Sequence, residues 1–108
     1  MVTVGQVAWG PGEHVGGPID RIFAALRELF PALLVTRLSV KHMSDDDNVW
    51  FLSLTRNFDV QIDSRPGGNP PFLLESDRAR MSTDDLVVAV ETLDLWLREE
   101  VDAAEIGK

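Results

Sequence analysis

The strongest constraint on the fold of this chain is a run of strict alternation at residues 57–63. Phe58, Val60 and Ile62 alternate there with the polar residues Asn57, Asp59, Gln61 and Asp63. Since successive side chains of a strand point to opposite faces, this pattern predicts a strand with one buried face and one face in water. The run lies within residues 45–75, which contain two further apolar runs and two turn-forming clusters. We expect this whole stretch to form the centre of an antiparallel sheet.

Further strands are expected on both sides of this run. Residues 49–54 are apolar on both faces except at Ser53, which is typical of a central strand. Residues 65–70 are turn formers, and residues 72–75 then form a fourth strand. Residues 1–17 contain five glycines and are expected to form a short edge strand or a loosely packed arm. An earlier strand alternates between two faces: one with Leu34, Thr36, Leu38 and Val40, the other with Val35, Arg37, Ser39 and Lys41.

Two helices are expected, one before and one after the strands. Residues 19–30 carry apolar side chains at helical spacing between Pro18, which suits a first helical turn, and Pro31, which ends the helix. The second helix begins after Ser82 or Thr83, either of which can cap it. Its inner face is expected to be apolar along its whole length. The residues on that face are Leu86, Val90, Leu93, Leu97 and Val101.

Together, these elements predict one α+β domain over residues 1–108. It is an antiparallel three- to four-stranded meander, flanked in sequence by two helices that pack on one face as a two-layer sandwich. The helices are expected to cover the face that carries Leu38, Val60 and Ile62. The opposite face would carry polar residues around whichever of Trp50 and Phe51 points outward: Arg37, Ser39, Lys41, Asn57, Asp59, Gln61 and Asp63. An aromatic ring among such residues is typical of a protein-binding surface, and the alternative is that they only solvate the face.

The chain has a net charge of −8, and its second half carries the acidity. Residues 45–63 hold five aspartates against Arg56, and residues 91–105 hold six acids against Arg98. Because affinity for nucleic acids and anionic membranes depends on Lys and Arg, neither is an expected partner. A basic protein is the expected partner. The alternative is that the acidity serves only solubility.

No group of residues has the spacing that a reaction or a metal site requires. Asp45, Asp46 and Asp47 are similar to the start of a calcium loop, but Arg56 stands where such a loop needs a glutamate, so a hairpin turn is favoured. The two histidines, His14 and His42, have no metal-binding spacing, and no cysteine is present. We therefore expect no catalytic residue, cofactor or metal.

The location expected for this protein is the cytoplasm. The absence of cysteine suits a reducing compartment. The first residues have no signal-peptide pattern, and no apolar run reaches the roughly 20 residues of a membrane-spanning helix. A membrane is therefore not an expected partner either, and secretion through a leaderless route stays open as the alternative.

Three segments carry a resemblance to a known group of proteins: residues 45–51, 60–64 and 68–75. There the chain resembles small, mostly uncharacterised bacterial proteins, some of which are similar to immunity proteins of polymorphic toxin systems. The likeness extends over residues 45–75, about a third of the chain. It implies an inhibitor that binds a toxin domain and blocks its active site without catalytic residues or a cofactor. It assigns no binding role to any single residue.

Three functional hypotheses follow from the sequence. The first is a non-catalytic protein-binding module, such as an immunity-type inhibitor of a basic toxin or nuclease domain. The second is a small enzyme or ligand-binding domain with a pocket near Trp9, Trp50 and His42. The third is a structural subunit that dimerises through its open sheet or its last strand, and both a monomer and a homodimer stay open. In the first hypothesis the contact residues are Asp45, Asp46, Asp47, Trp50, Phe51, Asp59, Gln61 and Asp63.

Overall fold

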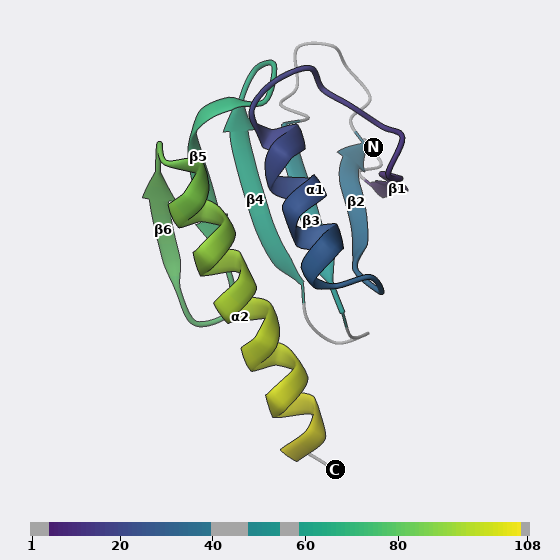
Figure 1. Cartoon of the computed structure of the whole chain (residues 1–108), viewed down its shortest axis with the longest axis vertical. Helices are drawn as coiled ribbons and strands as arrows, with labels where there is room; N and C mark the ends of the chain where they lie inside the picture. The colour runs from purple at the N-terminus through teal and green to yellow at the C-terminus, as the bar shows by residue number, and fades with distance from the viewer. Residues whose placement is uncertain (1–4, 40–47, 55–58, 107–108) are drawn as a thin grey trace.

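The computed structural model describes residues 5–39, 48–54 and 59–106. All six strands join one antiparallel sheet whose strand order is the chain order. Both helices lie on the same face of this sheet (Figure 1). The α+β fold with an antiparallel meander is confirmed. The elements are β1 (Gly5–Ala8), α1 (Ile19–Leu29), β2 (Leu34–Ser39), β3 (Val49–Ser53), β4 (Val60–Arg65), β5 (Asn69–Glu75), β6 (Arg80–Thr83) and α2 (Leu86–Ile106).

The prediction of three or four strands was too low, because the described residues alone form a sheet of six strands. The segment before α1 contributes β1, which pairs with β2 as an edge strand, one of the two options expected for residues 1–17. The other edge strand, β6, was not predicted, since four residues are too few for an alternating pattern to stand out. In addition, β5 begins at Asn69, inside the expected turn, with Asn69 paired to Arg65.

The prediction of which face of β2 is buried was also wrong. Val35 is buried under the helices, whereas Leu34 is 67% exposed on the opposite face. The pairing with β3 explains this result. Val35 lies opposite Leu52 and Arg37 lies opposite Trp50, and the two β3 residues, Leu52 and Trp50, are fully buried. Directly opposed residues share a face of the sheet, so β3 determines which side of β2 is covered. Four residues that were also assigned to faces lie outside the described residues: Val40, Lys41, Asn57 and Phe58.

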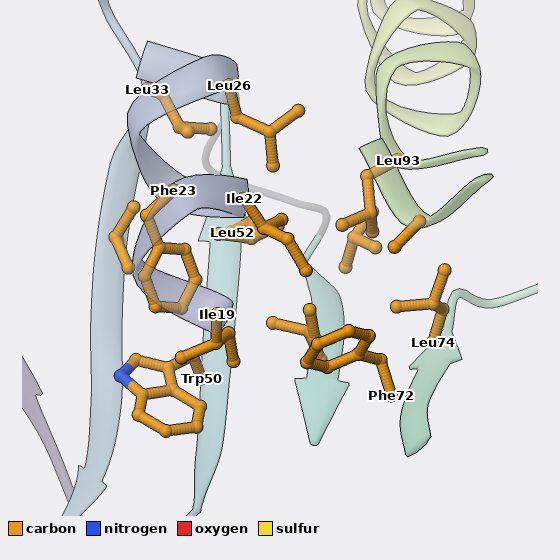
Figure 2. Packing of buried hydrophobic residues seen from close by; sticks show 14 of the residues in the cluster. Ile19, Ile22, Phe23, Leu26, Leu33, Trp50, Leu52, Phe72, Leu74 and Leu93 are labelled. Carbon is orange, nitrogen blue, oxygen red and sulfur yellow. The ribbon is translucent and has the colours of Figure 1, made fainter. Parts of the chain in front are cut away.

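The core fills the space between the two helices and the covered face of the sheet (Figure 2). Helix α1 buries residues at a spacing of three and four, as its pattern predicted: Ile19, Ile22, Phe23 and Leu26. Helix α2 buries Ala89, Leu93 and Leu97. Burying each large aliphatic side chain contributes about 1.5–3 kcal/mol. The sheet contributes Val35, Trp50, Leu52, Val60, Ile62, Phe72 and Leu74.

The loop before α1 packs against the turn between β4 and β5 through glycines. A Cβ atom on Gly17 would lie 1.9 Å from the carbonyl oxygen of Gly67. Gly68 has a φ of 74°, and its carbonyl accepts a hydrogen bond of 3.1 Å from the backbone N–H of Ile19. These contacts fix the start of α1 against the turn, so the segment next to the helix is packed and not loose.

Candidate functional site

The candidate functional site is the face of the sheet that points away from α1 and α2, which we call the open face. Its apolar side chains concentrate on β2 and β3, and its charged ones on β4, β5 and β6. The register of the sheet assigns residues to it, because opposed residues share a face. They are Gln6, Ala8, Leu34, Thr36, Leu38, Val49, Phe51, Ser53, Gln61, Asp63, Leu73, Glu75, Arg80 and Ser82.

A groove of about 330 Å³ lies on the open face. Leu34 and Phe51 provide its apolar wall, and Thr36, which lies directly opposite Phe51, forms part of its rim. The hydroxyl of Thr36 donates a hydrogen bond of 2.7 Å to Oε1 of Gln6, which connects β1 to this rim. The remaining lining residues are Ser53, Leu54 and Asp59. An aromatic ring beside an exposed leucine, with polar groups around them, makes an apolar patch with a polar rim, as protein-binding surfaces have.

Four of the predicted contact residues lie on or beside this face. Phe51 is half-buried and pairs with Gln61, whose amide donates a hydrogen bond of 2.8 Å to Asp63. Asp59 is exposed and lines the groove. The carboxylates therefore lie on the β4 side of the aromatic ring. The aspartates at positions 45, 46 and 47 lie outside the described residues.

Trp50 does not belong to the open face. Its ring is fully buried between the sheet and α1, where it contacts Phe23 at a centroid distance of 5.5 Å (Figure 2). Its indole N–H is buried without a hydrogen-bond partner in the part of the chain that the structure describes. Of the two aromatic residues considered for the outward position, Phe51 is the one that points to the open face.

Sequence reasoning missed Leu34, the most exposed large apolar residue of the groove. The pattern of residues 33–42 placed Leu34 on the buried face, and the three apolar residues at positions 33–35 gave no signal of which one faces outward. The groove depends on the pairing of β2 with β3, which the pattern of β2 alone does not contain. Arg37, which shares a face with Val35, made that face look like the exposed one.

Aromatic and cationic side chains occupy the region near Trp9 and Trp50. The two indole rings meet edge to face at 5.9 Å, and the guanidinium carbon of Arg37 lies 5.1 Å from the Trp9 ring centroid. The hollow beside Trp9 measures about 40 Å³, whereas small-molecule sites usually measure roughly 300 Å³ or more. The third residue of the predicted ligand pocket, His42, lies outside the described residues.

A second acidic region lies where α2 passes the turn between β5 and β6. Oε2 of Glu100 is buried and has no hydrogen-bond partner among the described residues. Burial, the largest cause, and the nearby carboxylates of Asp59 and Asp77 together raise the pKa of Glu100 to about 7. A hollow of about 70 Å³ adjoins this carboxylate. Its lining residues are Ser76, Asp77, Arg78, Ala79, Trp96, Glu99 and Glu100.

Metal sites and membrane spans were also sought in the structure. Within the three described ranges, no three His, Cys, Asp or Glu side chains come together as a metal site. In the same residues, no helix has both the length and the apolar character needed to cross a membrane. No protein-family model, curated protein or solved structure matches the chain. The resemblance to immunity proteins therefore stays a prediction.

Proposed function

We propose that this protein is a non-catalytic protein-binding module and that its partner binds to the open face of the sheet. The observation that carries the proposal is the groove in which Leu34, 67% exposed, adjoins the half-buried ring of Phe51. Removing the exposed part of a leucine from water contributes roughly 1–2 kcal/mol. Interface energy is concentrated in such central apolar anchors, and the polar residues around them exclude water.

The partner we propose for this face is a basic protein. The chain has a net charge of −8, and Asp59 is an exposed carboxylate at the groove. Complementary charge accelerates association, whereas apolar anchors slow dissociation. An immunity-type inhibitor of a basic toxin or nuclease domain would need this combination, because it acts by occupying an active site. This assignment rests on the resemblance described above.

The experiment that tests the proposal is affinity capture from a lysate of the organism that encodes the chain. The bait proteins are wild type, Leu34→Lys and, as a control with the same chemical change on the opposite side of the molecule, Leu95→Lys. Both leucines are more than half exposed, so both variants are expected to fold. Circular dichroism and thermal unfolding check that expectation before capture.

We expect at least one basic protein to be captured by wild type and by Leu95→Lys. Its recovery with Leu34→Lys should fall about tenfold, which corresponds to about 1.4 kcal/mol. Capture of nothing above background would contradict the proposal. So would a partner retained equally by all three bait proteins.

A further inference from the structure

Helix α2 carries apolar side chains on the side turned away from the sheet. Leu93, which is fully buried, marks the centre of its inner side. Leu95 is 55% exposed and Val88 is 39% exposed. At about 100° per residue, both lie within about 40° of the direction opposite Leu93. A helix that packs against a sheet on one side usually has a polar outer side, and two apolar residues seven positions apart there are spaced as a facing amphipathic helix would contact them.

Acidic side chains surround the two apolar residues. Glu91 lies between Val88 and Leu95 along the helix, and Glu99 and Asp102 continue the same side. All five of these residues are exposed, and together we call them the outer stripe of α2. The stripe itself contains no basic residue, and at its end Arg78 lines the same hollow as Glu99.

The basic residue nearest to the stripe in sequence, Arg98, already forms an ion pair with Asp94. Nε of Arg98 lies 2.8 Å from a carboxylate oxygen of Asp94, one helical turn earlier. The guanidinium carbon of Arg98 also lies 5.6 Å from the ring centroid of Phe30. Arg98 is therefore directed towards α1 and does not neutralise the outer stripe.

The charge of the outer stripe argues against a second copy of this chain as its occupant. An antiparallel pair of α2 helices centred on Leu95 would place Glu91 opposite Glu99 of the copy, because both are four residues from the centre. A parallel pair in register would place each glutamate opposite itself. Either arrangement desolvates like charges against each other, which costs free energy.

We propose that the outer stripe of α2 is a docking surface for a cationic amphipathic helix of a partner protein. Leu95 and Val88 are about 10 Å apart along the helix, a spacing that matches apolar residues two turns apart on a facing helix. Lysine and arginine residues beside those apolar positions would meet Glu91, Glu99 and Asp102. This surface lies on the opposite side of the sheet from the open face, so the two surfaces can be occupied independently.

The probe for this surface is a synthetic peptide of about 18 residues, which is five helical turns. It carries leucine at heptad positions a and d and lysine elsewhere, with blocked ends and a fluorescent label. A scrambled peptide of the same composition keeps the charge and destroys the amphipathic pattern. Fluorescence anisotropy measures the binding of both peptides to wild type, Leu95→Lys and Leu34→Lys.

We expect saturable binding of the amphipathic peptide to wild type and to Leu34→Lys. Leu95→Lys and the scrambled peptide should each weaken that binding about tenfold, because each removes the apolar contact that accompanies the charges. Since Leu34→Lys affects only the open face, failure of the proposed function would leave this result unchanged.

Three outcomes would overturn the inference. One is the absence of saturable binding to wild type. Another is equal binding of the scrambled peptide, or equal binding by Leu95→Lys, which would show that only net charge attracts the peptide. The last is a wild-type dimer in sedimentation equilibrium that Leu95→Lys converts to a monomer, which would assign the outer stripe to a second copy.

Discussion

Arg37 and Trp50 lie directly opposite each other on β2 and β3, and the guanidinium carbon of Arg37 is 4.8 Å from the centroid of the Trp50 ring. The same guanidinium reaches the ring of Trp9, and the backbone N–H of Trp9 donates a hydrogen bond of 2.9 Å to the carbonyl of Val35. A cation over aromatic faces is attracted by their electron density, and its aliphatic stem packs against apolar surface. This cluster therefore joins the segment after β1 to the core.

Replacing Arg37 by Ala should lower the free energy of unfolding by about 1–2 kcal/mol, because both the cation–π contacts and the packing of the stem are lost. Urea unfolding measures the change. Arg21→Ala is the matched control: Arg21 is exposed on α1, and its replacement should change stability by less than about 0.5 kcal/mol. Equal effects of the two replacements would show that the contacts between Arg37 and the indole rings do not stabilise the fold.

Two truncations test which side of α2 is buried. Leu93→Ala should lower the free energy of unfolding by about 2–4 kcal/mol, because the side chain is fully buried and its removal leaves a cavity. Leu95→Ala, two residues away on the same helix, should change it by less than about 0.5 kcal/mol. Val60→Ala on β4 should cost about 1–3 kcal/mol. A larger effect of Leu95→Ala than of Leu93→Ala in urea unfolding would mean that α2 packs with its other side inward.

Gly17 should be the least replaceable of the glycines in the segment before α1. The Cβ of Gly17→Ala would overlap the backbone oxygen of Gly67, which can be relieved only by moving the loop or the turn. We expect a loss of about 1–3 kcal/mol in thermal or urea unfolding. Gly12→Ala, where the added Cβ meets no atom within 4 Å, should be close to neutral. A neutral Gly17→Ala would show that the loop does not approach the turn this closely.

Glu100 should make stability depend on pH. Its folded-state pKa, raised from 4.5 to about 7, means that the folded chain holds a proton that the unfolded chain releases. The resulting stabilisation is complete below pH 4.5 and is lost as the pH rises through about 7. Glu100→Gln cannot lose that proton, so its thermal midpoint should exceed that of wild type more at pH 8 than at pH 5. Asp77→Asn, which removes one source of repulsion, should have a smaller effect in the same direction.

The contradicting result for Glu100 is a difference in midpoint between Glu100→Gln and wild type that is the same at pH 5 and pH 8. That result would mean that the carboxylate is hydrated in the folded protein. It would also mean that Asp59 and Asp77 lie too far away to affect its ionisation.

The parts of the fold that could be predicted are those in which one strand or helix contains the whole signal. On β4, Val60 and Ile62 alternate with polar residues, and this strand was oriented correctly. On α1, the apolar residues repeat at helical spacing, and Ile19, Ile22, Phe23 and Leu26 face the core, whereas Leu29 at the end of the helix is exposed. In both cases burial separates apolar from polar residues within a single element, so the pattern is sufficient.

The face of β2 could not be predicted because the strand is apolar on both sides. Leu34 and Leu38 form an apolar face on one side of the strand. On the other side, Val35 is followed by the charged Arg37, so the face that is actually buried looked like the exposed one. The choice depends on the opposite strand, where Trp50 accepts the guanidinium of Arg37 over its ring. The groove beside Leu34 follows from the same pairing, so the candidate site was predicted only on its Phe51 side.

The central claim, that a partner binds to the open face, is tested most directly by the dissociation rate of the captured protein from an immobilised chain. We expect Leu34→Lys and Phe51→Ala each to raise the dissociation rate about tenfold and Leu95→Lys to leave it unchanged, because binding energy lies in the desolvated apolar anchors. Association with wild type should slow as salt is raised, since charge steers the encounter. Dissociation rates that are the same for wild type, Leu34→Lys and Phe51→Ala would contradict the claim.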